Sequence, residues 1–285
     1  MRSLLKIGML ACTMALLTSC SNKNANSENI KSDIVSTSQI DKEDNSSEKK
    51  IKGEITIGAA ASLTDAFDEI IEKFNEENPD VKIKTTYASS GDIQTQIENG
   101  APIDLFVSAA QKQMDQLEQE NLIVKDTRFD LLENKVVLIT PKDSKLNLET
   151  FENVADNDDI KKGDVAIGMV DSVPVGQYTK EIYENLGLWE KVEQKANWAK
   201  DVRQVLDWVS QGESKVGIVY QTDAFTEKDK VNIVAKAPDK SHKPVVYPVA
   251  LVKNSENQKL ANSFLEYLKT DNAKKILTDY GFEVK

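Results

Sequence analysis

The stretch "GEITIGAAASLTDAF", residues 53–67, passes from a β-branched run through three alanines to a serine and an acidic segment. The apolar run that includes Ile55 and Ile57 is typical of a buried strand. Ser62 stands where a helix N-cap belongs, and Asp65 three residues later predicts a capping box. Two interpretations are open: an ordinary turn between a strand and a helix, or an anion site, because small residues leave a helix N-terminus accessible to a ligand.

The alternation of apolar runs with helical patterns continues to Lys285 and predicts an α/β fold. We expect strands at 54–60, 81–88, 103–109, 135–140, 164–169, 215–221 and 245–252. We expect helices at 62–79, 89–102, 110–123, 177–189, 201–212 and 257–281. Pro248 falls inside the last predicted strand, which indicates an edge strand or a segment that crosses between two lobes.

The first 52 residues are not expected to belong to the fold. Residues 1–19 have the features of a secretory signal, with two basic residues before an apolar core too short to span a bilayer. The motif "LTSC" at 17–20 resembles a bacterial lipobox, which implies cleavage before Cys20 and a lipid on its sulfur. Residues 20–52 are polar and lack aromatic side chains, so we expect a disordered tether. The lipid would then anchor a mature chain that has no transmembrane helix.

Few residues outside the signal can support metal or nucleophilic chemistry. Cys12 leaves with the signal and Cys20 is the expected lipid site, so the folded region has no cysteine for a disulfide, a thiolate metal site or a nucleophile. His242 is the single histidine and lies in a polar loop, whereas a zinc enzyme needs several ligands. A Ser-His-Asp hydrolase is not excluded by this count, but the chain has no G-x-S-x-G motif.

The acidic composition limits the class of partner. The formal net charge is −11 at pH 7, which argues against nucleic acid and against anionic lipid as partners. It does not exclude a small dehydrated anion, because local dipoles rather than net charge can hold such a ligand.

Several segments share one pattern, in which a strand ends, a small or hydroxyl residue follows and a helix begins. They are Ser62, 89–91, 173–176, 201–203 and Tyr220. Ligands of open α/β sheets gather at the carboxyl ends of strands, and each helix N-terminus there carries a partial positive charge. Taken singly, each residue also has an ordinary interpretation as an N-cap serine, a core valine or a half-buried tyrosine.

Six ordered segments give a more specific indication: "AAASLTDAF", "YASSGDIQTQIENGAPIDLFVSA", "VPVGQYTKE", "DVRQVL", "GIVYQTDA" and "YPVALV". Together they resemble the periplasmic molybdate-binding proteins of ABC transporters, over nearly all of 53–285. The resemblance implies a type II periplasmic-binding-protein fold, with two α/β lobes and a ligand cleft between them. The lobes would comprise 53–134 with 247–285, and 135–246, joined by crossing strands near 131–140 and 245–252.

The resemblance also implies a binding site. In that family serine hydroxyls, backbone N–H groups and a tyrosine hydroxyl hold the oxyanion. Block by block, the serines correspond to Ser62 and Ser90, the backbone donors to Val175 and Val202, and the tyrosine to Tyr220. These residues would bind the oxygens of the anion, with no direct ligand to the metal atom and no cofactor.

Two positions depart from the family pattern. Val175 stands where alanine is commoner, so its methyl groups must point away from the pocket or tighten it. Gly91 stands where a further serine is frequent, which removes a polar neighbour.

Molybdate suits a site made of donors, because the tetrahedral dianion offers only acceptors and charge-assisted hydrogen bonds are strong. Tungstate is nearly isosteric, so we expect it to bind too. Sulfate or another oxyanion is the alternative cargo, which an Arg or Lys in the site would favour.

An enzyme on the same scaffold is a further alternative, but the nearby carboxylates suit helix caps and first turns, so we expect no catalysis. These are Asp65, Asp92, Asp171 and Asp201.

The expected mechanism is hinge closure over the anion, followed by docking on an ABC permease. The protein would work as a monomer held by its lipid on the extracytoplasmic face of the cell membrane. The sequence leaves open the preference between molybdate and tungstate, the affinity, the identity of the permease, the degree of closure and whether the cell has an outer membrane.

Overall fold

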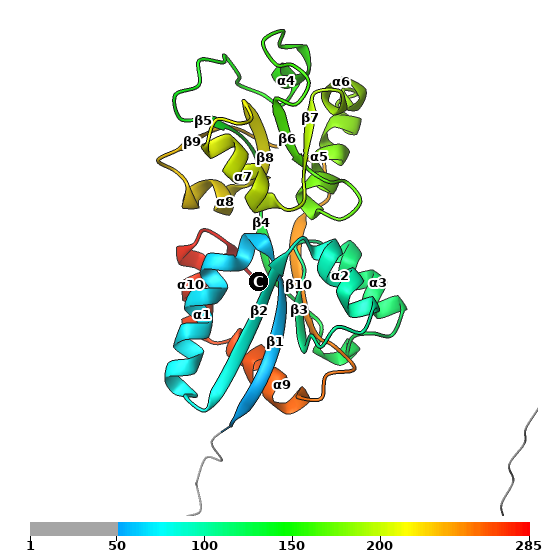
Figure 1. The fold of residues 1–285 in the computed structure, drawn as a ribbon, viewed down its shortest axis with the longest axis vertical. Helices are drawn as coiled ribbons and strands as arrows, with labels where there is room; N and C mark the ends of the chain where they lie inside the picture. The colour runs from blue at the N-terminus through cyan, green and yellow to red at the C-terminus, as the bar shows by residue number, and fades with distance from the viewer. Residues whose placement is uncertain (1–50) are drawn as a thin grey trace, which may run out of the picture. The chain divides into compact units, whose positions relative to one another are not determined.

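The computed structural model describes residues 51–285 and shows two β-sheets flanked by helices (Figure 1). The predicted α/β class is therefore confirmed. The predicted signal peptide, Cys20 and most of the tether lie outside the described residues. Among residues 51–285, no helix combines the length and the apolar character needed to cross a membrane.

The first sheet has six strands in the order β11-β4-β10-β3-β1-β2. Their bounds are β1 Gly53–Ala60, β2 Val81–Ala88, β3 Leu105–Val107, β4 Phe129–Asn134, β10 Val245–Leu251 and β11 Glu283–Val284. Strand β1 pairs in parallel with β2 and β3, whereas β10 runs antiparallel to β3 and β4. The carboxyl ends of β1, β2 and β3 therefore meet at one edge of the sheet.

The second sheet has five strands in the order β7-β6-β8-β5-β9. Their bounds are β5 Val136–Pro141, β6 Val165–Gly168, β7 Ala196–Ala199, β8 Val216–Tyr220 and β9 Val231–Lys236. Strand β6 pairs in parallel with β7 and β8, so these three strands also end at a common edge.

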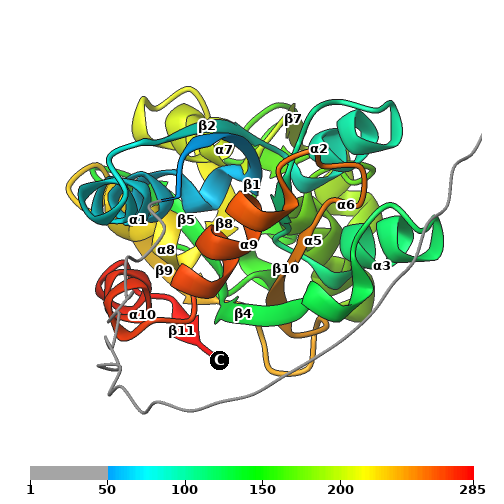
Figure 2. The same cartoon turned by 90° about the horizontal axis from the view of Figure 1, so that it is seen from below.

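Helices cover both faces of the first sheet, and Figure 2 shows them on opposite sides. On one face lie α1 Thr64–Glu77, α9 Gln258–Tyr267 and α10 Asp271–Asp279, and on the other lie α2 Ser90–Glu98 and α3 Gln111–Gln119. Phe74 on α1 packs edge-on against Phe264 of α9, with ring centroids 5.2 Å apart. We call this sheet with its helices the first lobe.

The second sheet carries the helices of the middle of the chain, and together they form the second lobe. These helices are α4 Glu152–Asp156, α5 Pro174–Asn185, α6 Trp189–Glu193, α7 Val202–Ser210 and α8 Gln221–Thr226. Short 3-10 turns, η1 Ala61–Leu63 and η2 Lys125–Thr127, occur in the first lobe. Fully buried residues such as Val205 and Leu206 of α7 and Ile218 of β8 contribute to the hydrophobic core.

Two segments connect the lobes. Strand β4 ends at Asn134 in the first sheet, and β5 starts at Val136 in the second. The chain returns between Lys236, the end of β9, and Val245, the start of β10. We keep the predicted boundaries, 53–134 with 247–285 and 135–246, as a proposal for where the lobes divide.

Several local predictions need correction. Ser62 is not an N-cap: it lies inside η1, α1 begins at Thr64, and no side chain caps either element, so the predicted capping box is wrong. Strand β10 is not an edge strand, because it pairs on both sides. The sheet tolerates Pro248 there because the register of the β10–β4 pairing shifts between Tyr247 and Pro248.

Other boundaries also differ from the prediction. The helix expected from residue 177 begins at Pro174, which is suited to the first turn because it lacks an N–H. The long C-terminal helix is divided into α9 and α10, and the Thr270 side chain caps α10 by accepting the Ala273 N–H.

Candidate functional site

Six strand ends converge on one small cavity. From the first lobe come the residues that follow β1, β2 and β3, and from the second come the residues at or after the ends of β6, β7 and β8. The lining residues are Ala60, Ala61, Ser62, Ala88, Ser89, Ser90, Ala109, Val173, Pro174, Val175, Asp201, Val202 and Tyr220. The structure thus brings together all five residues that the sequence predicts for the site.

The cavity is small and carries no cationic side chain. The space open to the centre of a water molecule is about 10 Å³, far below the roughly 300–1,000 Å³ of pockets for drug-sized ligands. No Lys, Arg or His is among the lining residues, and Asp201 is the one carboxylate. The Asp201 carboxylate accepts the Gln204 N–H as the N-cap of α7, as its sequence position predicts. Any attraction for an anion must therefore come from hydroxyl and backbone N–H groups.

The Ser62 side chain is buried, and its hydroxyl already takes part in one hydrogen bond. Its Oγ lies 2.9 Å from the hydroxyl oxygen of Tyr247, on β10. The alanines around it, Ala60 and Ala61, have no side chain long enough to fill the cavity or shield this hydroxyl.

Ser90 has a different local role from its neighbour. Ser89 is the N-cap of α2 and accepts the Asp92 N–H, whereas Ser90 is the first residue of the helix. The Ser90 Oγ accepts the backbone N–H of Ala109 over 2.9 Å. Because the Ala109 N–H occupies a lone pair of the Ser90 oxygen, the hydroxyl hydrogen of Ser90 is available for a ligand.

Val175 and Val202 lie in the first turns of α5 and α7. The first N–H groups of a helix have no carbonyl partner within the helix. Val173, at the N-cap of α5, makes no side-chain capping bond, and Asp201 accepts from Gln204 rather than from Val202. Both valines therefore contribute backbone donors, while their side chains are buried in the core.

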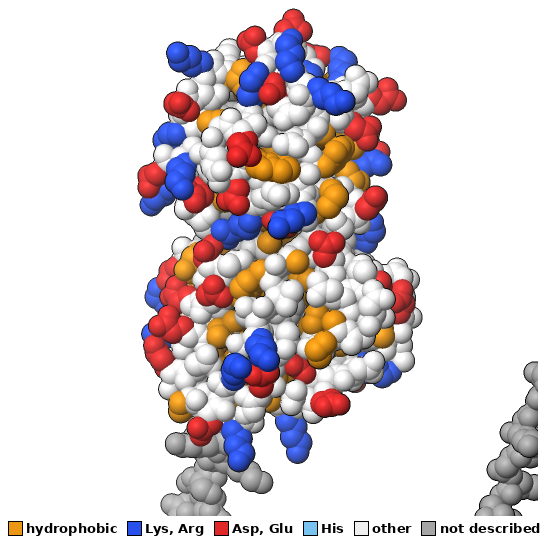
Figure 3. Space-filling model, in the orientation of Figure 1, with side chains coloured by type: hydrophobic (Ala, Val, Ile, Leu, Met, Phe, Trp, Pro, Cys, Tyr) orange, Lys and Arg blue, Asp and Glu red, His pale blue; other side chains and the backbone are white. Residues whose placement is uncertain are grey.

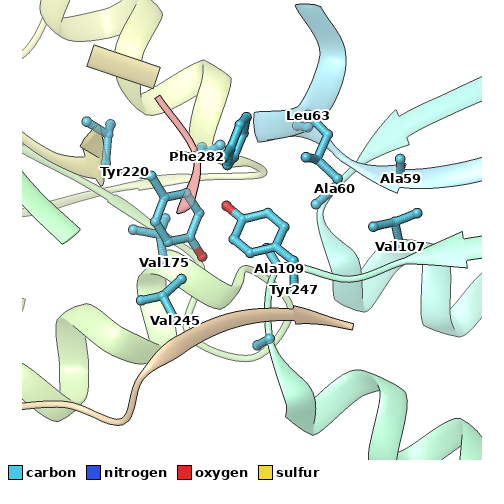
Figure 4. Packing of buried hydrophobic residues seen from close by; sticks show 14 of the residues in the cluster. Ala59, Ala60, Leu63, Val107, Ala109, Val175, Tyr220, Val245, Tyr247 and Phe282 are labelled. Carbon is cyan, nitrogen blue, oxygen red and sulfur yellow. The ribbon is translucent and has the colours of Figure 1, made fainter. Parts of the chain in front are cut away.

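Tyr220 ends β8 and is 1% exposed. Among the described residues, its hydroxyl has no hydrogen-bond partner. Burial raises its pKa well above 10, so the phenol keeps its proton and can donate. Figure 4 shows Tyr220 beside Tyr247, and their rings meet edge-on with centroids 5.8 Å apart. A buried hydroxyl without a partner is costly, so this one points to a bound acceptor.

Arg203 follows Val202, and its guanidinium is paired with two carboxylates. Its Nη2 donates to Asp65 of the first lobe over 2.6 Å, and its Nε lies 2.8 Å from the Asp223 carboxylate on α8. Burial alone would lower the pKa of Arg203, but Asp223 and Asp65 together raise it. Burial raises the pKa of Asp223 to about 6, although Arg203 opposes that shift. The guanidinium charge is therefore balanced beside the cavity rather than offered to it.

A second contact joins the lobes through backbone atoms. The N–H of Gly91 on α2 donates to the carbonyl of Ser172, before α5, over 2.9 Å. A Cβ at position 91 would lie 2.5 Å from that oxygen, so a side chain there would push the lobes apart. The departure at Gly91 therefore has a steric consequence that the sequence did not indicate.

The remaining acidic candidates do not form a reactive cluster. Asp65 and Asp92 lie in the first turns of α1 and α2, and Asp171 lies in the turn before α5. Within residues 51–285, no group of three or more His, Cys, Asp or Glu is arranged to hold a metal ion.

Sequence reasoning missed Tyr247 and Asn134 as neighbours of the site, whereas Arg203 belongs to the segment 201–203 that the sequence had singled out. The first two lie on strands that lead to and from the lobe connections, and no helix N-terminus marks them. For Tyr247 the only signal was its place in the segment "YPVALV".

A family model for bacterial extracellular solute-binding proteins matches residues 55–283. This chain belongs to that family. YvgL of Bacillus subtilis, whose name describes an ABC transporter substrate-binding lipoprotein, is 42% identical, over 83% of this chain and 88% of YvgL. The molybdate-binding protein ModA of Haemophilus influenzae is 41% identical, over 81% of this chain and 90% of ModA.

The fold agrees with solved structures of the same kind. The periplasmic molybdate-binding protein of Azotobacter vinelandii superposes with a TM-score of 0.70, over 81% of this chain and 99% of that chain, at 21% identity. The predicted periplasmic-binding-protein fold is thereby confirmed. The chain thus combines the family match of a bacterial extracellular solute-binding protein with the corresponding fold.

Proposed function

We propose that this protein captures molybdate, and also tungstate, in the cavity between its lobes and delivers it to an ABC permease. The observation that carries the proposal is the buried Tyr220 hydroxyl, which has no hydrogen-bond partner among residues 51–285 and lies in a cavity whose lining residues include further donors and no Lys, Arg or His. In this proposal Ser62, Ser90 and Tyr220 donate through their hydroxyls, and Val175 and Val202 donate through backbone N–H groups.

The donor set favours a fully deprotonated tetrahedral anion. The Ser90 oxygen already accepts a protein N–H, and the buried tyrosine stays protonated. A protonated oxyanion needs an acceptor for its own O–H, which such a cavity offers poorly. The identity of 41% to a protein named for molybdate supports the same cargo. We therefore favour molybdate over sulfate, because Arg203, the cation beside the cavity, is already paired with Asp65 and Asp223.

The proposal extends to the location of the protein. The lipobox-like motif at Cys20 and the name of YvgL support a lipid anchor on the extracytoplasmic face of the membrane. On the described face, acidic and basic side chains are interspersed (Figure 3), which agrees with a partner other than a polyanion. Labelled fatty acid should be incorporated into the wild type and not into Cys20→Ala, and incorporation into both would refute the anchor site.

Thermal unfolding of the purified protein, stripped of oxyanions, tests the cargo. A ligand at about 100 times its Kd stabilises the folded state by about 2.7 kcal/mol, or about 5–10 °C for a protein of this size. We expect this shift with molybdate and tungstate and a smaller one with equal sulfate or phosphate. Equal shifts with sulfate would point to the alternative cargo, and no shift with any of the four would overturn oxyanion binding.

A further inference from the structure

A chain of hydrogen bonds leads from the lobe connection to the Ser62 hydroxyl. Asn134 ends β4, immediately before the chain enters the second lobe. Its side-chain oxygen accepts the N–H of Lys135 over 2.8 Å, which leaves its NH₂ group facing the opposite way. That NH₂ group donates to the Thr222 hydroxyl over 2.8 Å and to the Tyr247 hydroxyl over 3.3 Å.

The hydrogen bond from the Lys135 N–H to the Asn134 side-chain oxygen determines the direction of the other bonds. An amide NH₂ can only donate, so the Tyr247 oxygen is the acceptor from Asn134. Tyr247 is completely buried, and its single hydrogen has the Ser62 Oγ as an acceptor 2.9 Å away. Ser62 therefore accepts from Tyr247, and its own hydrogen is left to point into the cavity that it lines.

We infer that Tyr247, supported by Asn134, is a positioning residue that fixes the Ser62 hydroxyl as a donor toward the bound anion. The inference rests on the proposed oxyanion-binding function and adds a source of specificity to it. Without Tyr247, the Ser62 hydroxyl could rotate and accept a hydrogen bond from a protonated oxyanion. With Tyr247, Ser62 matches Ser90, whose oxygen is engaged by the Ala109 N–H.

The test is a double-mutant cycle on anion affinity, measured by titration calorimetry with molybdate and with phosphate. Tyr247→Phe removes the orienting hydroxyl but keeps the ring that packs on Tyr220 and Phe282. We expect molybdate affinity to fall about 3- to 10-fold. In a Ser62→Ala background the same change should have almost no further effect, because Tyr247 acts through Ser62.

Selectivity separates positioning from a general loss of structure. The ratio of molybdate to phosphate affinity should fall in Tyr247→Phe, whereas a structural defect would weaken both anions alike. Tyr183→Phe is the matched control: Tyr183 is also fully buried and donates to the Phe151 carbonyl over 3.2 Å, but it does not line the cavity. This control should lose thermal stability and keep its anion affinity.

Asn134→Ala tests the same inference if Tyr247→Phe does not fold. We expect it to lower the molybdate affinity and the ratio of molybdate to phosphate affinity, each by less than Tyr247→Phe does. Losses that add in full in the double mutant, or an unchanged selectivity ratio, would overturn the inference while leaving the proposed function intact. Failure of the wild type to bind molybdate would instead overturn the proposed function, and the inference with it.

Discussion

Arg203 of α7 donates to the carboxylate of Asp65 of α1 over 2.6 Å, and this ion pair joins the two lobes beside the cavity. The same guanidinium approaches the backbone carbonyl of Ser62 at 3.5 Å. These contacts can form only when the lobes are close together, so the pair stabilises the closed arrangement.

Asp65→Asn should therefore weaken anion binding through faster release. Asp65 is 42% exposed, so the solvent screens the pair and its contribution is about 0.2–1 kcal/mol. This corresponds to an affinity loss of about 1.5- to 5-fold. Stopped-flow release of molybdate at low and high salt measures it. The exposed pair Lys73–Glu76 on α1 gives a control, Glu76→Gln, whose release rate should equal that of the wild type.

The buried carboxyl of Asp223 should make stability depend on pH. Burial raises its pKa from 3.8 to about 6, so the folded protein keeps this proton at a pH where the unfolded chain has lost it. The contribution of this group to the free energy of unfolding is therefore largest below pH 4. It falls by up to about 3 kcal/mol as the pH rises to 6, and it is constant above that.

Urea unfolding of the wild type and of Asp223→Asn at several pH values isolates this contribution. The difference between the two proteins should change across pH 4–6, with the wild type losing stability relative to the variant as the pH rises. A difference that stays constant over this range would show that Asp223 titrates normally.

Tyr220→Phe should lower the affinity for molybdate while leaving the anion-free protein at least as stable as the wild type. A hydrogen bond to a charged group contributes about 1.5–3 kcal/mol, which corresponds to an affinity loss of about 10- to 150-fold. In the absence of ligand the hydroxyl has no partner in the described part of the chain, so its removal relieves an unsatisfied buried group. Calorimetric titration measures the molybdate affinity, and thermal unfolding measures the stability of the anion-free protein. Unchanged affinity in Tyr220→Phe would exclude Tyr220 from the site.

The local pattern of small residues and helix starts indicated which strand ends could supply a site, and the resemblance to molybdate-binding proteins selected the five residues and implied that they converge. Ser62, Ser90, Val175, Val202 and Tyr220 all line the cavity. The local prediction for Ser62 was nonetheless wrong, because its hydroxyl partner, Tyr247, lies 185 residues away in the chain. A tertiary contact of this kind competes with helix capping, and no spacing rule detects it.

The strand predictions had a similar limit. Central strands with Val and Ile runs, such as β5 and β8, were found, whereas β7 (Ala196–Ala199) was missed because it is a four-residue edge strand with few β-branched residues. Pro248 indicated an edge strand or a crossing segment, and the edge alternative is wrong because a register shift in the pairing with β4 lets an interior strand hold this proline. Such irregularities depend on the neighbouring strand and are not visible in one segment.

Gly91→Ala should hold the lobes apart and reduce affinity. The added Cβ would lie 2.5 Å from the Ser172 carbonyl oxygen, well inside van der Waals contact, and would also break the 2.9 Å bond from the Gly91 N–H. Strain of this kind costs about 1–3 kcal/mol, and because it arises only on closure, molybdate affinity should fall about 5- to 150-fold.

Thr95→Ala, on the exposed side of the same helix, is the control for α2 itself. Small-angle scattering with saturating molybdate should show the wild type more compact than Gly91→Ala. Equal compaction with equal affinity would mean that α2 shifts to accommodate the methyl group, and that the Gly91–Ser172 contact does not limit closure.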